Sequence, residues 1–240
     1  MIVIISLLYL DNKFKKHKSA SFLKEYPSNQ KMWPHRGYSV INQSYRLEDI
    51  GLAAQKGFFG IELDLFYSIE NKDFLVTHEL PVKDTLWLSD LLNTNKNRFF
   101  YWFDLKNLSR DNVDSVFEAL QTINKNYWLN NQFFIESKEA KELAVLKNKG
   151  INTCLWIKTP NKNKLFSYYY WRYKNKWDIV YYDFSTVSFP ADLLDKQEYQ
   201  DYNHLNICTW TNKSDSNQLD DILLNHQQIK VLLFDRVEGI

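Results

Sequence analysis

Short apolar runs alternate along the chain with segments whose apolar residues have helical spacing. The runs span four to seven residues, and most are rich in Ile, Val, Leu, Phe, Tyr or Trp, which is typical of buried strands. The eight runs are Met32–His35, Gly60–Leu65, Arg98–Asp104, Gln132–Glu136, Asn152–Ile157, Asp178–Tyr182, His204–Trp210 and Lys230–Asp235. The pattern therefore predicts eight buried strands.

The segments between these runs predict helices. The clearest is Ser109–Lys125, in which apolar residues recur every three or four positions. Similar segments are Tyr45–Lys56, Lys138–Lys149 and Gln218–His226, whereas Lys162–Lys176 is ambiguous and Phe184–Tyr202 only partly helical. Alternating strands and helices form parallel βα units, so we predict an α/β fold with a single (β/α)₈ TIM barrel. An open doubly wound sheet is the alternative, but no glycine-rich phosphate loop follows the first run.

A chain of 240 residues suits one barrel domain. We assign residues 29–240 to the barrel and residues 1–28 to an N-terminal extension. Ile2–Leu10 is mostly apolar and precedes a lysine-rich stretch, the reverse of the order in a cleavable signal peptide. The run is too short to span a bilayer. The extension is therefore either an element that packs on the barrel or the remnant of a membrane anchor.

The charge balance argues against one class of partner. The chain has 30 basic and 29 acidic residues, which gives a net charge of +1. We therefore expect no nucleic-acid partner. Cys154 and Cys208 have neither metal-ligand spacing nor a disulfide framework, and we expect buried thiols. A cytoplasmic and a membrane-associated location both remain open.

Polar side chains gather where the predicted strands end. The first strand ends at His35 and Arg36, the third at Asp104, the fourth at Glu136 and the last at Asp235. Barrel enzymes build their active sites at the carboxyl ends of the strands. The pattern therefore predicts an active site at this end of the barrel.

Acidic residues on two neighbouring strands predict a metal site. Glu62 and Asp64 stand two positions apart, so both project to the same face of the second strand. Two carboxylates buried together repel each other unless a cation lies between them. Oxygen ligands favour Mg²⁺, Ca²⁺ or Mn²⁺. Asp104 supplies a third carboxylate, and Lys106, two residues further, directs an ammonium group at an anionic substrate.

Two histidines flank the acidic pair along the chain. His35 precedes it and His78 follows it, and imidazoles exchange protons near neutral pH, so we expect a general acid–base pair. Arg36 either binds phosphate or stabilises its own loop. Glu136 is a hydrogen-bond acceptor behind the site, a further ligand or neither, and Trp210 either walls the site or fills the barrel.

These residues resemble the glycerophosphodiester phosphodiesterase family, within the phospholipase C-like phosphodiesterases. The matching motifs are His35-Arg36-Gly37, Gly60-Ile61-Glu62-Leu63-Asp64, Val76-Thr77-His78 and Asp104-Leu105-Lys106, with weaker matches at Phe134-Ile135-Glu136-Ser137, Thr209-Trp210-Thr211 and Leu233-Phe234-Asp235. The resemblance implies that Glu62, Asp64 and Asp104 bind Mg²⁺ or Ca²⁺ and that His35 and His78 are catalytic. It also implies that Arg36 and Lys106 contact the phosphate.

Three departures from the family pattern indicate a divergent branch. Asn42 stands where a supporting glutamate is usual, Glu79 replaces an aspartate, and Asp104 replaces a longer glutamate. We predict a phosphodiesterase that acts on a glycerophosphodiester or a phospholipid-derived substrate. Two alternatives are a phospholipase-type lyase that forms a cyclic phosphate and an inactive barrel that binds a phosphorylated glycan or lipid. Membrane association is left open, because Tyr168–Trp177 is either a lid, a membrane-facing loop or a packed helix.

Overall fold

The computed structural model describes residues 2–18, 22–39, 45–81, 85–94, 99–159, 164–211 and 215–236. The strands are β1 Met32–Pro34, β2 Gly60–Ser68, β3 Asp73–Val76, β4 Phe100–Leu105, β5 Phe133–Ser137, β6 Thr153–Trp156, β7 Thr186–Pro190, β8 Asn206–Thr211 and β9 Ile229–Phe234. The α-helices are α1 Ile2–Lys15, α2 Ser28–Lys31, α3 Leu47–Gln55, α4 Leu88–Thr94, α5 Val113–Asn126, α6 Ala140–Asn148, α7 Leu165–Tyr182, α8 Gln197–Gln200 and α9 Ser216–Asn225. Two 3₁₀ helices are η1 His35–Tyr38 and η2 Ala191–Leu193.

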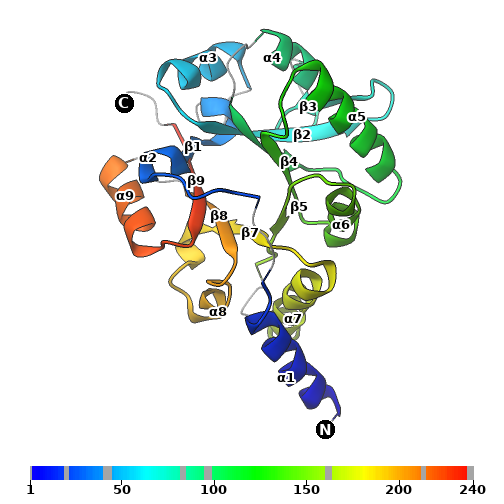
Figure 1. The fold of residues 1–240 in the computed structure, drawn as a ribbon, viewed down its shortest axis with the longest axis vertical. Helices are drawn as coiled ribbons and strands as arrows, with labels where there is room; N and C mark the ends of the chain where they lie inside the picture. The colour runs from blue at the N-terminus through cyan, green and yellow to red at the C-terminus, as the bar shows by residue number, and fades with distance from the viewer. Residues whose placement is uncertain are drawn as a thin grey trace.

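The strands form one curled sheet in the order β1-β9-β8-β7-β6-β5-β4-β2-β3. Each neighbouring pair is parallel except β2 and β3, which are antiparallel. Figure 1 shows the sheet curving around a centre, with the helices on its outside. The α/β prediction with parallel βα units is thereby confirmed, and the fold is barrel-like.

The curled sheet comes close to closing where β1, at one end of the strand order, approaches β2, the second strand from the other end. The ring of Trp33 on β1 lies against Gly60, where a Cβ atom would come within 2.5 Å of the indole. β3 pairs with the second half of β2, from Leu65 to Ser68. Among the described residues, no backbone hydrogen-bond ladder joins β1 to β2. The strand pairings therefore give a curled, barrel-like sheet, and the predicted closure of the barrel stays a prediction.

The sixth predicted strand was wrong. Asp178–Tyr182 is the end of α7, which stops at Asp183 in a left-handed conformation (φ 58°). A five-residue apolar run cannot by itself separate a strand from the buried side of a helix. The strand at this place in the sheet is β7, whose Thr186 and Ser188 are fully buried and broke the apolar pattern.

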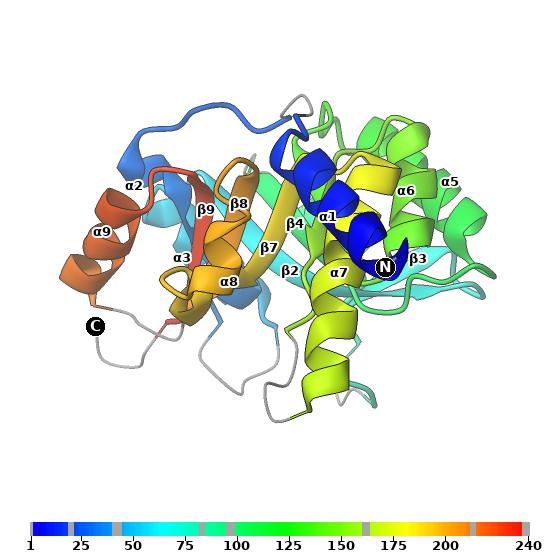
Figure 2. The same ribbon diagram turned by 90° about the horizontal axis from the view of Figure 1, so that it is seen from below.

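The N-terminal segment packs on the rest of the molecule. α1 lies beside α7, with Phe14 fully buried and Asp11 2.6 Å from the ammonium of Lys176. The chain that leads into α2 then crosses one end of the sheet (Figures 1 and 2), where Glu25 pairs with Lys230 at the start of β9. The division at residue 28 stays a prediction.

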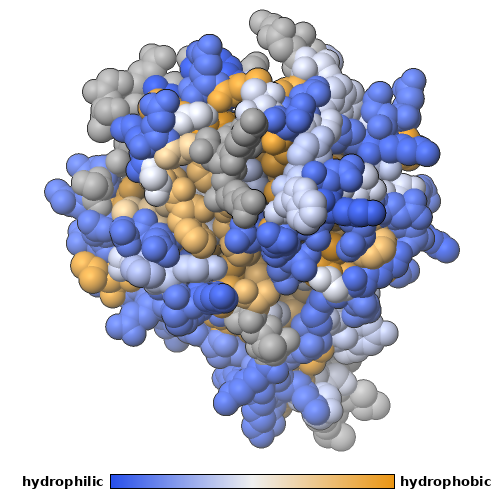
Figure 3. Space-filling model, turned by 45° about the horizontal axis from the view of Figure 1, so that its top comes forward, coloured by the Kyte–Doolittle hydropathy of each residue, from blue (hydrophilic) through white to orange (hydrophobic). Residues whose placement is uncertain are grey.

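A cluster of apolar side chains fills the inside of the curled sheet. Its buried members are Leu23, Trp33, Trp102, Phe134, Cys154, Cys208, Val231 and Leu233. Both cysteines are free and buried, as predicted. On the face drawn in Figure 3, hydrophobic residues show in a central stretch between hydrophilic ones. No helix among the described residues is both long and apolar enough to cross a membrane.

Candidate active site

A cavity of about 410 Å³ opens at the carboxyl ends of the strands. Parallel register explains why its polar residues meet there, since Asp64 pairs with Asp104 across β2 and β4, and Asp104 pairs with Glu136 across β4 and β5. The cavity is lined by His35, Arg36, Glu62, His78, Trp102, Asp104, Lys106, Glu136, Trp156, Trp210, Leu233 and Asp235. Residues from distant parts of the sequence therefore share one site.

Three carboxylates form the centre of the site. Glu62 and Asp64 are almost completely buried, and one oxygen from each lies within 4.8 Å of the others and of an oxygen of Asp104. Burial, followed by repulsion from Asp64, raises the pKa of Glu62 well above its ordinary value. Burial also raises the pKa of Asp104, against the attraction of Lys106. This clustered oxygen donor set fits a divalent cation, which would offset the repulsion.

A tight turn after β1 holds one of these carboxylates. Arg36, Gly37 and Tyr38 all have positive φ angles, and the turn directs the backbone N–H of Arg36 at Glu62 Oε2, 2.8 Å away. A Cβ atom on Gly37 would come within 3.0 Å of Ile50, so glycine suits this close approach. The turn therefore couples the His-Arg-Gly motif to the acidic cluster.

Tyr45 holds the second carboxylate. Its hydroxyl donates to Asp64 Oδ2 at 2.7 Å and accepts from the backbone N–H of Asp64 at 2.8 Å. Burial, and then the charges of Asp64 and Glu62, raise the pKa of Tyr45. Tyr45 was not predicted as a site residue, because no sequence signal separates it from the other 14 tyrosines of the chain.

Two basic side chains accompany the acidic cluster. The Lys106 ammonium lies 2.5 Å from Asp64 Oδ1 and also pairs with Asp104. Although burial opposes its charge, Asp104, Asp64 and Glu62 raise the pKa of Lys106. The Nε of Arg36 is 3.8 Å from Asp64 Oδ2 and buried, with no hydrogen-bond partner among the described residues. This free donor at the cavity suits an anion.

The two predicted histidines line the same cavity. His35 Nδ1 is 2.8 Å from Asp235 Oδ1, and its Nε2 is 3.7 Å from Glu62 Oε2. Asp235 thereby orients the ring, a role that was not predicted from the sequence. His78 follows β3 and is 41% exposed. Burial lowers the pKa of His78, with Arg36 and Lys106 acting in the same direction and Asp64 opposing them.

Glu136 and Trp210 also lie at the cavity. Glu136 accepts a hydrogen bond from Trp102 Nε1 at 2.8 Å and another from Ser188 Oγ. Trp210 packs edge-on against Trp156, with ring centroids 6.4 Å apart, and these two indoles wall the site. Ser188 and Trp156 were not predicted as residues of the site. Asn42, the third supporting candidate, falls outside the described residues.

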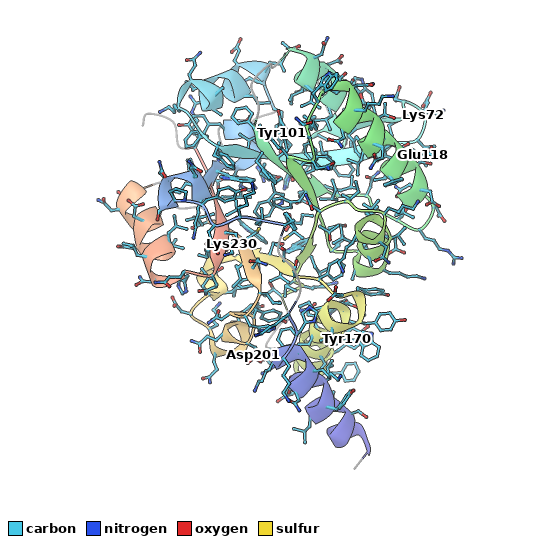
Figure 4. All side chains as sticks on the ribbon, in the orientation of Figure 1. Lys72, Tyr101, Glu118, Tyr170, Asp201 and Lys230 are labelled. Atoms are coloured by element: carbon cyan, nitrogen blue, oxygen red, sulfur yellow. The ribbon has the colours of Figure 1, made fainter. Side chains whose placement is uncertain are left out.

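Glu136 is expected to make stability depend on pH. Burial, followed by the charge of Asp104, raises its pKa to about 8, so the folded protein retains a proton that the unfolded chain releases near its ordinary pKa of 4.5. Stability without metal should therefore fall between pH 5 and 8, by several kcal/mol at about 1.4 kcal/mol per pKa unit. Glu136→Gln should remove this loss, as urea unfolding in chelator at pH 5 and pH 8 would measure. Glu118→Gln, on the outside of α5 (Figure 4), is the control, and an equal effect of Glu136→Gln at both pH values contradicts the expectation.

Sequence comparison alone places the chain in no known family: no family model matches it, and no curated protein does. Solved structures are similar in fold. A glycerophosphodiester phosphodiesterase from Parabacteroides distasonis is 14% identical with a TM-score of 0.63, over 86% of this chain and 93% of that one. A phosphodiesterase from Oleispira antarctica, solved with the product sn-glycerol-3-phosphate, is 13% identical with a TM-score of 0.63, over 89% and 94%. A glycerophosphodiester phosphodiesterase from Agrobacterium tumefaciens is 13% identical with a TM-score of 0.59, over 86% and 95%. The chain thus has the fold of glycerophosphodiester phosphodiesterases.

Proposed function

We propose that this protein is a metal-dependent phosphodiesterase that hydrolyses a glycerophosphodiester- or phospholipid-derived substrate by histidine acid–base catalysis. The observation that carries the proposal is the cluster of three carboxylates, Glu62, Asp64 and Asp104, at a cavity that two basic side chains and two imidazoles also line. The fold adds support, because barrel active sites lie at this end of the strands. We also propose that the curled sheet closes into a complete (β/α)₈ barrel.

We assign the metal site to Glu62, Asp64 and Asp104. Their carboxylate oxygens suit Mg²⁺ or Ca²⁺ better than zinc, which prefers nitrogen and sulfur ligands. When bound, such an ion supplies a Lewis acid that polarises the phosphoryl oxygens. Tyr45 and the backbone N–H of Arg36 keep two of the three carboxylates in place.

The basic residues bind the phosphodiester. The Nε of Arg36, which has no hydrogen-bond partner among the described residues, donates to a phosphate oxygen. The Lys106 ammonium contributes positive charge where negative charge grows in the transition state. Both groups stand at the edge of the acidic cluster, so the phosphate is held beside it. Trp156 and Trp210 border the apolar side of the cavity and contact the remainder of the substrate.

The histidines transfer protons. The lowered pKa of His78 leaves its imidazole neutral at pH 7, so it can accept a proton from the attacking water. His35, oriented by Asp235 through Nδ1, presents Nε2 to the cavity and donates a proton to the departing alkoxide oxygen. The P–O bond to the leaving alcohol breaks as the new P–O bond forms.

Removal of divalent metal is expected to abolish turnover. Chelator should reduce hydrolysis of glycerophosphocholine or bis-(p-nitrophenyl) phosphate to background, and Mg²⁺ or Ca²⁺ should restore it, because the three carboxylates alone repel the substrate. Undiminished turnover in chelator would count against the metal site. Tight binding of a phosphorylated ligand without turnover, across several metals, would favour an inactive barrel.

The product separates hydrolysis from the lyase alternative. Phosphorus NMR during turnover of a glycerophosphodiester should show a linear monoester if water attacks. A lasting cyclic phosphate would instead mean that a hydroxyl of the substrate attacks.

A further inference from the structure

Helix α7 carries a row of exposed aromatic side chains. We call this row the α7 stripe; it consists of Phe166, Tyr169, Tyr170, Trp177 and Tyr181, which are 49–87% exposed. Their spacing of three, four or seven residues places them on one side of the helix. Tyr170 projects away from the sheet in Figure 4. Exposed aromatic surface of this extent on a folded protein indicates an interaction site.

The stripe is exposed although α7 is firmly packed through its other sides. Lys176 is almost fully buried and contacts Asp11 of α1 at 2.6 Å and Asp201 at 2.7 Å. Asn175 donates to the carbonyl of Lys158 at 3.0 Å, and Ile179 is completely buried. The orientation of the helix is therefore fixed, and the aromatic side faces outward as part of that orientation.

The stripe begins at the same end of the molecule as the candidate active site. α7 follows β6, so its first turn starts at the carboxyl end of the strands, and Figure 2 shows this part of the helix extending beyond the sheet. Phe166, in that first turn, is the most exposed residue of the stripe at 87%. An apolar ring thus projects at the rim of the site.

Lysines and carboxylates together line a depression beside the middle and second half of α7. This depression of about 340 Å³ between α6, β6 and α7 is lined by Lys138, Lys141, Lys158 and Lys174, together with the carboxylates Glu139, Glu142 and Asp178. Lys174 neutralises Asp178 at 2.5 Å. The ammonium of Lys158 lies 3.9 Å from the ring centre of Trp171, and within the described ranges it has no carboxylate partner. Trp156 lines both this depression and the active-site cavity, so the two are neighbours.

We propose that the α7 stripe docks on the surface of a bilayer that contains anionic lipids, which brings the rim of the active site, where Phe166 lies, to the membrane. Tyr and Trp are the side chains that favour the membrane–water interface, and lysines beside them attract anionic headgroups. The further consequence, which rests on the proposed function, is that the substrate is a phosphodiester of a membrane lipid. A two-fold contact between copies of this chain is disfavoured, because it would bring the same lysines together.

Vesicle sedimentation with the full chain tests the docking surface. The wild type should sediment with phosphatidylcholine–phosphatidylserine vesicles and bind less to phosphatidylcholine alone. Phe166→Gln combined with Tyr170→Gln should weaken partitioning roughly tenfold or more, since two aromatic side chains then lose apolar burial. The matched control is Trp128→Asn, which removes a 72% exposed indole from the loop before β5, at the opposite end of the strands. It should sediment like the wild type.

Turnover of a soluble diester separates docking from catalysis. The double variant should hydrolyse bis-(p-nitrophenyl) phosphate as the wild type does, but lose turnover of a lipid phosphodiester in vesicles. Failure of the wild type to sediment, or sedimentation of the double variant at wild-type level, overturns the docking proposal. A wild-type dimer that the double variant converts to a monomer also overturns it, by assigning the stripe to a second copy. Sedimentation without any diester turnover would leave docking supported and the proposed function refuted.

Discussion

Glu62→Gln is expected to lower kcat/KM for a phosphodiester by roughly a thousandfold or more, equivalent to about 4 kcal/mol of transition-state stabilisation. The substitution retains the acceptor for the Arg36 backbone N–H and removes one of the three charges assigned to the metal. Steady-state kinetics at saturating Mg²⁺ or Ca²⁺ measures the loss. Glu70→Gln, an exposed position in the turn between β2 and β3, should leave turnover unchanged.

The same substitution should stabilise the protein when no metal is present. Burial and Asp64 raise the pKa of Glu62, so its ionised form costs free energy of folding above the ordinary carboxyl pKa. Removing the charge should therefore raise the denaturation midpoint in chelator at pH 8. An activity loss together with a lower midpoint would indicate a damaged fold instead of a lost ligand, and an unchanged kcat/KM would refute the assignment.

His35→Ala is expected to lower kcat by roughly a hundredfold or more, the usual range for removing a general acid or base. KM should change little, because the proposed function assigns phosphate binding to Arg36, Lys106 and the metal site. Asp235→Asn should have a smaller effect in the same direction, since it preserves the shape of the group that orients His35 but removes its charge. The rates are measured on a diester with a poor leaving group, for which protonation of the alkoxide matters most.

His226→Ala is the control for the histidine prediction. Its imidazole lies 3.4 Å from Asp195 and does not line the active-site cavity, so turnover should be retained. Wild-type kcat in His35→Ala would remove His35 from the catalytic mechanism, and an equal fall in His226→Ala would show that the effect is not specific.

The candidate site could be predicted to a large extent because its residues obey simple strand geometry. Glu62 and Asp64 share a face of one strand, and parallel register places Asp104 directly opposite Asp64. The predicted residues His35, Arg36, Glu62, His78, Asp104, Lys106, Glu136 and Trp210 all line one cavity. Their catalytic and binding roles remain proposals.

The residues that were missed depend on tertiary contacts. Tyr45 reaches Asp64 from a loop 19 positions earlier, and Ser188 reaches Glu136 from a strand that the sequence did not reveal. That strand escaped prediction because Thr186 and Ser188 are polar yet completely buried. β3 escaped because an antiparallel strand interrupts the expected βα alternation. Hydrophobic periodicity carries no information on such polar or irregular elements.

The central claim is that distant acids and imidazoles surround a divalent cation in one pocket. Anomalous diffraction from crystals grown with Mn²⁺, whose ligand preferences resemble those of Mg²⁺, tests it most directly. The account predicts one strong peak bound by Glu62, Asp64 and Asp104, with Arg36, His35 and His78 around it. A peak at another place would contradict the claim. So would the absence of any peak in crystals in which Lys106 still pairs with Asp64 and Asp104.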